Sequence, residues 1–549
     1  MSRPLDLYDI QGNIVRAYGR FGFPHARYFF FHVAAGAVGR AFVRRLEPFI
    51  TTAERWEGGP DDAQQGGVPR PQVTLNLGFS WRGLEALDMP TETLAQMPRE
   101  YIDGMARRSS ILRDVGPSGY DHWDTIWQRS FSDPDYAVHM WVAVAAQMQP
   151  DGTPVPDLDD WTDWLRSLAD ATHGGVVLLS GHGPTEEDYQ QAGSRLEPHG
   201  DGTMRASRKE HFGFVDGIGN PVFAGQFAKR AEQIRVRGRG KIMPDQSWRP
   251  IATGEFLLGH VDESQELPIA TQPARFMQNG TFMAFRKLHE DVPTFLNYLA
   301  DQSEIYARVM HVSLEEAAAT LRAKMVGRWA NGAPLMNVPT YQDMLQFEKD
   351  WADIPELLNK GATRTKQEED RLDTYRRLLI DFKYRHDQVG VKCPITAHIR
   401  RANARDMLDP RLSSKNPRDW DGSALSNRRR ILRRGLPYGS FDPDHPEASE
   451  EHGIIFIACC ADLKRQFEFV LQQWINYGMD VNSGNDTCPV IGPHATNEKF
   501  IIPADKSTGG QPYVMNAIKQ FVTTRGGEYF FMPSITVIRM IGAGMVDPT

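Results

Sequence analysis

The chain has 549 residues, more than one domain usually contains, so at least two domains are expected. Its residues are 41% hydrophobic and 10% aromatic, a composition that is typical of a folded protein and excludes bulk disorder. The 62 Lys and Arg residues against 70 Asp and Glu residues give a net charge of −8, which disfavours a nucleic-acid surface spread over the whole chain.

Cysteine content and hydropathy predict the compartment. Only four Cys residues occur, too few to crosslink so long a chain in an oxidising environment. The first residues, MSRPLDLYDIQGN, carry no export signal. The longest apolar stretches, 28–38 and 136–146, are shorter than the ~18 residues that a spanning helix needs. We therefore expect a cytoplasmic protein without a membrane span.

In the first half of the chain, apolar residues either alternate or recur with helical spacing. This pattern predicts strands at 26–34, 73–79, 136–145 and 174–180. It predicts helices at 38–49 and along the stripe of Leu158, Trp161, Leu165 and Leu168. Strands and helices therefore alternate loosely through this half.

The second half has a similar rhythm. Strands are predicted at 255–260, 281–286, 453–460 and 528–532. Helices are predicted near 292–299, after a capping box of Ser313 and Glu316, and along the stripe of Phe467, Val470, Leu471 and Trp474. The segment 235–253 mixes Gly, Pro and charge and is the expected joint, which divides the chain into domains 1–240 and 241–549. Segments 363–385 and 403–427 are expected to be insertions.

The first candidate site is the segment GFVDG at residues 213–217. Its glycines permit tight turns, and a carboxylate at Asp216 among apolar neighbours could have a shifted pKa and act as an acid or base. A glycine-rich turn with a capping Asp is the structural alternative. No Gly-Lys-Ser/Thr follows, so the segment is not a phosphate loop.

The second candidate is His398 in the segment KCPITAHIRRAN. The chain has no H-E-x-x-H and no paired C-x-x-C, which disfavours a zinc site made by protein ligands alone. A single His suits a haem iron, because the porphyrin supplies the equatorial ligands. A purely structural role remains the alternative for any one of the 16 His residues.

The third candidate is the run RRRILRRGLPYG at residues 428–439, with five Arg in seven residues. Such a run usually forms a solvated or anion-binding face, and a nucleic-acid patch is one alternative. Ile431 and Leu432 interrupt the charge, so we expect one Arg to point inward. A buried guanidinium could stabilise negative charge that develops on a bound oxygen species.

Together these segments resemble, in the family's order, the G-x-x-D-G motif, the proximal-histidine segment and the distal-arginine segment of the dye-decolourising peroxidases. The resemblance runs from DIQGNIV through TFMAFRKL and KMVGRWANGAPL to residues 453–474, so it covers nearly the whole chain. It implies an α+β fold of two ferredoxin-like domains, with antiparallel sheets flanked by helices. It also implies one haem b per chain, held mainly by the second domain. The length and the lack of an export signal resemble the longer, intracellular bacterial subgroups.

The resemblance also implies the roles of the three candidates. His398 would be the proximal iron ligand, Asp216 would move a proton between the oxygens of hydrogen peroxide, and Arg433 would stabilise the charge that develops as the O–O bond breaks. The enzyme would then oxidise dyes, phenols or other aromatic donors by one-electron steps. Because an Asp with a pKa near ~3.9 stays ionised in mild acid, an acidic optimum is expected.

Four further residues are assigned by similarity. Asp462 is the expected acidic partner of the proximal imidazole, with a helix N-cap as the alternative role. Arg286 and Arg400 or Arg401 are expected to pair with haem propionates, with a surface position as the alternative.

Three other functions compete with the peroxidase. A non-catalytic haem carrier would need no paired distal acid and Arg, whereas this chain has both. Haem-dependent oxygen insertion or iron release would use the same His but depend less on Asp216. A nucleic-acid site at residues 428–434 is disfavoured by the net charge and by the absence of interleaved aromatic residues. The expected partners are hydrogen peroxide and aromatic donors, with no nucleic acid and no membrane, in a monomer or homodimer.

Overall fold

The computed structural model describes residues 4–57, 67–183, 187–268, 271–411, 414, 416, 419–442, 451–494, 498–505 and 509–547. Ten strands of the described chain form one antiparallel sheet in the order β11-β13-β10-β16-β2-β3-β1-β4, with β5 beside β1 and β12 beside β13. Their bounds are β1 His25–Val33, β2 Val73–Phe79, β3 Met140–Ala146, β4 Val176–Leu178, β5 Gln190–Gly193, β10 Thr281–Glu290, β11 Leu432–Arg433, β12 Leu436–Tyr438, β13 Gly453–Cys460 and β16 Val522–Met532.

Three two-stranded hairpins lie outside this sheet. They are β6 Leu196–Pro198 with β7 Met204–Ala206, β8 Lys241–Ile242 with β9 Trp248–Arg249, and β14 Lys499–Ile502 with β15 Tyr513–Asn516. The hairpin of β8 and β9 falls within the predicted joint at 235–253.

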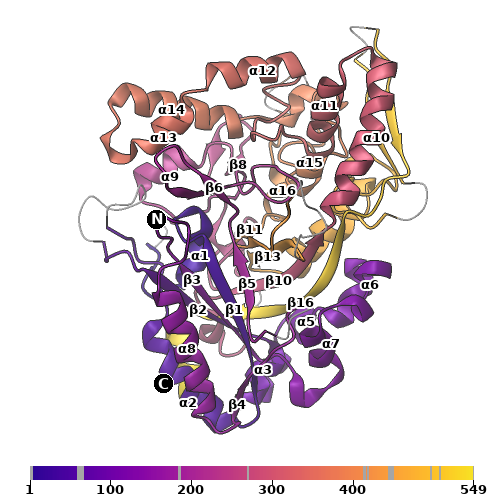
Figure 1. The fold of residues 1–549 in the computed structure, drawn as a ribbon. Coiled ribbons are helices and arrows are strands. Elements are labelled where there is room, and N and C mark those ends of the chain that lie inside the picture. The colour runs from indigo at the N-terminus through magenta and orange to yellow at the C-terminus, as the bar shows by residue number, and fades with distance from the viewer. Residues whose placement is uncertain are drawn as a thin grey trace.

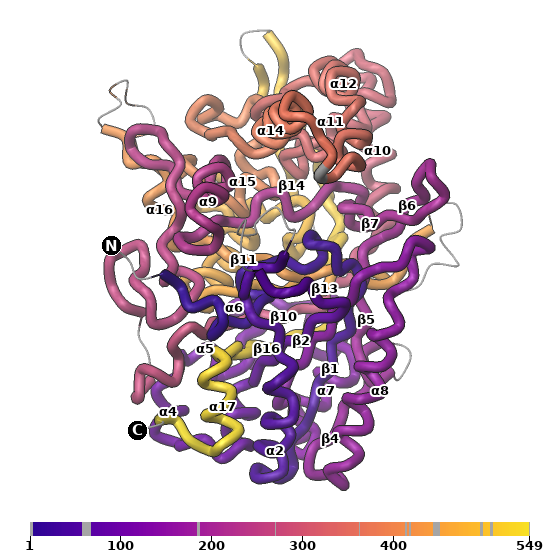
Figure 2. The backbone as a smooth tube through the Cα atoms, turned by 90° about the vertical axis from the view of Figure 1, so that its left-hand side faces the viewer, coloured from indigo at the N-terminus to yellow at the C-terminus, as the bar shows by residue number. Residues whose placement is uncertain are grey.

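The helices surround the sheet. They are α1 Gly12–Val15, α2 Gly36–Leu46, α3 Trp81–Ala86, α4 Thr91–Ala95, α5 Arg99–Asp103, α6 Ser109–Leu112, α7 Thr125–Ser132, α8 Asp157–Asp170, α9 Lys229–Arg235, α10 Val292–Met310, α11 Leu314–Val326, α12 Tyr341–Asp350, α13 Ile354–Asn359, α14 Lys366–Ile380, α15 His398–Ala402, α16 Ala424–Asn427 and α17 Ile535–Ala543. Figure 1 shows α10, α11, α12 and α14 at one end of the molecule and α2 and α8 near the other, beside β4. Figure 2 shows α17 close to α2 at that same end. None of the helices described is long and apolar enough to cross a membrane.

The sheet joins strands from both halves of the chain. Its two groups of strands meet where Phe79 of β2 pairs with Phe531 of β16. The sheet also curls, because Phe30 of β1 and Phe285 of β10 lie four strands apart in order, yet their ring centroids are 5.2 Å apart. In Figure 2, α2 and α17 lie below β1, β2 and β16. One hydrophobic core therefore contains aromatic residues from both halves.

The predicted α+β class is confirmed, and most predicted elements exist. The strands at 73–79 and 453–460 match β2 and β13, and the strand at 26–34 is displaced from β1 by a single residue. The expected insertion at 363–385 contains α14. The stripe after residue 463 forms π-helical turns, Lys464–Glu468 and Val470–Ile475. Residues 412, 413, 415, 417 and 418 of the expected insertion 403–427 lie outside the described residues.

The strand predicted at 255–260 is wrong. The chain instead makes a 3-10 turn, Thr253–Glu255. Glu255 is fully buried, and its backbone carbonyl accepts hydrogen bonds from the Ala461 N–H and the Gln466 amide. Its carboxylate pairs with Arg465 at 2.6 Å. The segment is therefore held by side-chain and turn contacts at the end of β13, which hydropathy does not reveal.

Candidate active site

A cavity of about 410 Å³ lies between the two halves of the chain. This volume is within the range of about 300–1,000 Å³ that is typical of ligand and cofactor sites. Four of the seven predicted site residues line it, namely Asp216, Arg286, His398 and Arg433. The walls between them are mainly apolar, contributed by residues such as Ile218, Leu288, Ile399, Ile457 and Val490.

Asp216 lies in a loop whose backbone conformation requires glycine at two positions. Gly213 and Gly217 have φ angles of +88° and +67°, in the left-handed region that favours glycine. A Cβ at Gly217 would also lie 2.4 Å from the Arg20 guanidinium. That guanidinium in turn donates a hydrogen bond to the Asp216 carbonyl. The G-x-x-D-G pattern therefore fixes a tight turn that aims the Asp216 carboxylate into the cavity.

Arg433 faces this carboxylate from β11. Its Nη1 donates to Asp216 Oδ1 at 2.6 Å. Asn220, which follows the Asp216 loop, binds the Arg433 backbone twice: its Oδ1 accepts from the Arg433 N–H at 3.1 Å, and its Nδ2 donates to the Arg433 carbonyl at 3.3 Å. The loop and the strand are thus held together by hydrogen bonds from the Asn220 side chain to the backbone of Arg433 as well as by charge.

The electrostatics of the pair keep Asp216 ionised. Burial raises the pKa of Asp216, and the Arg433 guanidinium opposes that effect. With added contributions from the Gly217 N–H and Arg20, the pKa falls to about 2. The side chain is nevertheless 52% accessible, because it opens into the cavity. A small molecule in the cavity can therefore reach an ionised carboxylate.

His398 is the first residue of α15 and contributes its ring to the cavity wall. Its Nδ1 lies 3.3 Å from the sulfur of Cys488. Among the described residues, no hydrogen-bond partner of Nε2 is found. One ring nitrogen is therefore held by the protein, while the other is free to ligate a metal.

Arg286 projects from β10 into the same cavity and is only 4% exposed. Its Nη2 donates to Asp114 and to Thr524. Its Nε and Nη1, by contrast, are buried without a partner in the described chain. A buried guanidinium with two unused donors is suited to binding an anion, and the propionate contact stays a prediction.

Arg400 and Arg401 require a correction, because neither lines the described cavity. The turn of α15 directs His398, Ile399 and Ala402 toward the cavity and places the two arginines on the opposite face. Arg400 is fully buried, with its Nη1 3.1 Å from Asp387 Oδ2.

Arg401 donates to the backbone carbonyls of Ile475, at 2.9 Å, and Asp486. The two arginines are thus neither propionate ligands nor the surface residues of the alternative. They anchor α15 inside the protein.

Asp462 also requires a correction. Its Oδ1 accepts the Arg465 N–H at 2.7 Å, and its Oδ2 pairs with Arg465 Nε at 3.1 Å. This is the N-cap role given as its alternative. The residue beside His398 is Cys488, which is 90 positions away in sequence.

Two buried carboxyls of the cavity were missed by sequence reasoning. Glu210 accepts the backbone N–H groups of Phe212 and Phe214, each at 2.7 Å. Glu290 hydrogen-bonds to Glu210, and its Oε2 is buried without a partner in the described chain. Burial is the main cause that raises the pKa of Glu210 to about 7 and that of Glu290 well above its usual value. Only Glu210 had a sequence signal, because it lies six residues before Asp216.

The other arginines of the run 428–434 are used inside the protein. Arg434 donates to the Ile14 carbonyl at 2.6 Å, and Arg428 pairs with Asp262 at 2.8 Å. Arg429 stacks over the ring of Phe469 at 3.8 Å. The run therefore braces the cavity wall and does not form an open cationic face.

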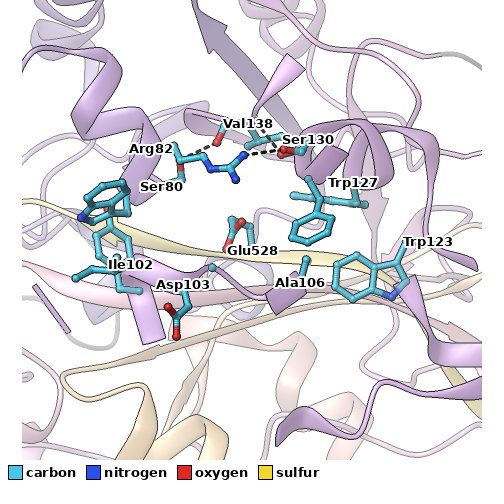
Figure 3. A pocket seen from close by; sticks show the side chains of 15 residues that line it. Ser80, Arg82, Ile102, Asp103, Ala106, Trp123, Trp127, Ser130, Val138 and Glu528 are labelled. Carbon is cyan, nitrogen blue, oxygen red and sulfur yellow. Dashed lines mark hydrogen bonds between the residues drawn. The ribbon is translucent and has the colours of Figure 1, made fainter. Parts of the chain in front are cut away.

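A second, smaller pocket is lined by residues of α3, α5 and α7 (Figure 3). Its volume of about 30 Å³ suffices for one or two water molecules. Figure 3 shows the Arg82 guanidinium across the pocket from Glu528, with a hydrogen bond of 3.1 Å to the Ser130 carbonyl. The pocket is too small for an organic substrate, whereas the large cavity holds four of the predicted site residues and is the candidate active site.

The fold and the cavity define an α+β protein with a buried cofactor site. Comparison with known proteins assigns its family. A model of the C-terminal part of Dyp-type peroxidases matches residues 418–487. A dye-decolorizing peroxidase of Auricularia auricula-judae, AauDyP1, is 31% identical over 489 residues, covering 85% of this chain and 75% of that protein. Peroxidase 2 of Mycetinis scorodonius is 25% identical, covering 97% of this chain and 87% of that protein.

Solved structures agree in fold. An ancestral D-type dye-decolorizing peroxidase superposes with a TM-score of 0.67 at 24% identity, covering 98% of this chain and 99% of that one. The chain belongs to the dye-decolourising peroxidase family, and it is a peroxidase. These relatives are mostly fungal, whereas the sequence alone suggested the longer bacterial subgroups.

Peroxidases of this family are haem enzymes, and the cavity fits that group. Its walls are apolar, as a porphyrin requires. His398 offers a free ring nitrogen, and Arg286 offers two unused buried donors for a propionate. These features together match the three parts of a haem.

Proposed function

We propose that this chain binds one haem b and reduces hydrogen peroxide while oxidising dyes, phenols or other aromatic donors in one-electron steps, with an acidic optimum. The observation that carries the proposal is the 2.6 Å pair of Asp216 and Arg433 in the same cavity as His398. A structure of a related peroxidase in complex with 2,6-dimethoxyphenol supports phenols as donors.

In this proposal His398 holds the iron through Nε2, and Arg286 holds a propionate. The haem supplies the redox chemistry, because its iron and porphyrin can take up the two oxidising equivalents of a peroxide. The protein supplies a mainly apolar cavity and groups that move a proton and stabilise charge.

Asp216 is the proton carrier. Because its pKa is about 2, its carboxylate is ionised in mild acid and can accept a proton from one peroxide oxygen. The same carboxylate can return that proton to the other oxygen, which leaves as water. Arg433 stabilises the negative charge that develops on the departing oxygen, and its contact with Oδ1 orients the carboxylate.

Location and assembly are also proposed. All four Cys residues are buried and free, which supports a reducing compartment such as the cytoplasm. A monomer or homodimer remains the expected assembly, and we expect no nucleic-acid or membrane partner. Cell fractionation and sedimentation would test these points directly.

The deciding experiment is stopped-flow absorbance of the haem-loaded protein mixed with hydrogen peroxide at mildly acidic pH. Wild type should react rapidly and then oxidise 2,6-dimethoxyphenol, whereas Asp216→Ala should react far more slowly while binding haem normally. Haem binding without a peroxide reaction in the wild type would favour the carrier alternative. An equal rate in Asp216→Ala would remove Asp216 from the mechanism.

A further inference from the structure

The group beside the proposed iron ligand is a thiol. Cys488 Sγ lies 3.3 Å from His398 Nδ1, within hydrogen-bonding distance for sulfur. No carboxylate oxygen of the described chain forms a hydrogen bond with His398. Asp462, the acid expected there from sequence, is instead committed to Arg465.

The contact is built into the fold. The Cys488 N–H donates to the Ile475 carbonyl at 2.7 Å, and the Gly492 N–H donates to the Cys488 carbonyl at 2.9 Å. Arg401 of α15 donates to that same Ile475 carbonyl at 2.9 Å and also to the Asp486 carbonyl. The helix that bears His398 is therefore hydrogen-bonded, through Arg401, to the Ile475 and Asp486 carbonyls that flank Cys488.

The chemistry of the pair follows from its donors and acceptors. If His398 ligates through Nε2, its neutral ring carries the proton on Nδ1, and that N–H donates to Cys488 Sγ. A carboxylate acceptor raises the basicity of a metal-bound imidazole, whereas a thiol sulfur is a weak acceptor. A sulfur partner therefore orients the ring but strengthens its electron donation to the metal less than a carboxylate would.

We propose that Cys488 is the positioning residue of the iron ligand: its sulfur fixes the orientation of the His398 ring and keeps the ligand a weaker electron donor than a carboxylate-paired histidine. This inference rests on the proposed role of His398. It predicts that the wild-type haem iron has a higher ferric/ferrous potential than the same protein with a carboxylate at position 488.

Two measurements on the haem-loaded protein test the inference: the ferric/ferrous midpoint potential and the iron–histidine stretching frequency of the ferrous form. Cys488→Asp should lower the potential and raise the frequency, because a carboxylate withdraws the Nδ1 proton more strongly. Cys488→Ala removes the acceptor, so the frequency should fall or its band should broaden. Cys460→Ala, an equally buried Cys in β13 that does not line the described cavity, is the matched control and should change neither.

Each failure has its own signature. If Cys488→Asp and Cys488→Ala bind haem with the wild-type potential and stretching frequency, Cys488 does not act through His398 and the inference is overturned. If His398→Ala retains the wild-type iron–histidine band, the proposed ligand itself is wrong. Because Cys488→Ala deletes only one atom, its folding can be verified by the melting temperature of the haem-free protein.

Discussion

Replacing Arg433 by Leu should move the acidic limb of the peroxide reaction to higher pH. Asp216 is an active base only when ionised, so activity is lost as the pH falls through its pKa. Two unit charges about 4 Å apart interact by about 1 kcal/mol in water and about 4 kcal/mol at an effective dielectric constant of about 20. At about 1.36 kcal/mol per pKa unit, removing the guanidinium raises the pKa of Asp216 by roughly 1 to 3 units.

Because the Asp216–Arg433 pair is partly exposed to solvent, we expect a rise in the pKa of Asp216 at the lower end of that range. The Asp216 side chain is 52% accessible and the Arg433 side chain 34%, so solvent screens their interaction. We expect the acidic limb to move from near a pKa of about 2 by roughly one unit. The plateau rate should also fall by about 10²–10³, as when one donor to a developing anion is removed.

The assay is the stopped-flow rate constant with hydrogen peroxide, measured across the acidic range for wild type and Arg433→Leu. Arg208→Leu is the matched control, because Arg208 lines the cavity but its side chain does not bond to the Asp216 carboxylate in the described structure. Its acidic limb should move less than that of Arg433→Leu. Coincident limbs for wild type and Arg433→Leu would refute the electrostatic argument.

Three further changes test the cavity and its support. Arg286→Met removes two donors to a propionate and, at about 1.5–3 kcal/mol per charged hydrogen bond, should weaken haem binding by about 10²–10⁴ in a haem titration. The raised pKa values of Glu290 and Glu210 mean that the folded state binds protons more tightly than the unfolded state, so stability falls as pH rises from about 4.5 toward 7. Glu290→Gln removes one of these two carboxyls and should therefore flatten the pH dependence of the melting temperature. Arg400→Met removes the cation beside the buried Asp387, whose carboxylate keeps only the Lys392 and Cys393 N–H groups as donors in the described structure. It should destabilise the fold by about 3 kcal/mol, which a lowered melting temperature would report.

Each of these changes has an exposed counterpart. Arg376→Met, on a half-exposed residue of α14, should leave haem binding unchanged. Glu315→Gln on the surface of α11 should leave the pH trend as it is. Arg371→Met removes a surface pair with Asp353 and should change the melting temperature little. If a surface variant changed haem binding, the pH trend or the melting temperature as much as its buried counterpart does, burial would not be the cause of the effect.

Local sequence predicted the parts of the fold whose residues repeat with a regular period. The strand at 453–460 is continuously apolar and became β13, and the alternation at 73–79 became β2. The motif residues Asp216 and His398 were found because glycines and small residues surround them in sequence. The position of Asp216 opposite Arg433, by contrast, depends on contacts between residues 217 positions apart.

The errors have a common physical cause. Residues next to a site residue in sequence need not face the same way, and the two-residue step from His398 to Arg400, about 200° around α15, points Arg400 away from the cavity that His398 lines. Conversely, Cys488 reaches His398, and Glu290 reaches the cavity wall, only through tertiary packing. Periodicity identifies which residues are buried, but it does not identify which buried residues meet.

The relation between Asp216 and Arg433 shows why a single substitution there is informative. Both bonds from Asn220 reach the backbone of Arg433, so they survive when its side chain is changed to Leu. The Asp216 carbonyl separately accepts a hydrogen bond from Arg20. The backbone N–H of Asp216 donates to the Arg208 carbonyl at 2.9 Å. The loop therefore keeps its place when the guanidinium is removed, and a shift in the acidic limb reports the lost charge and not a displaced carboxylate.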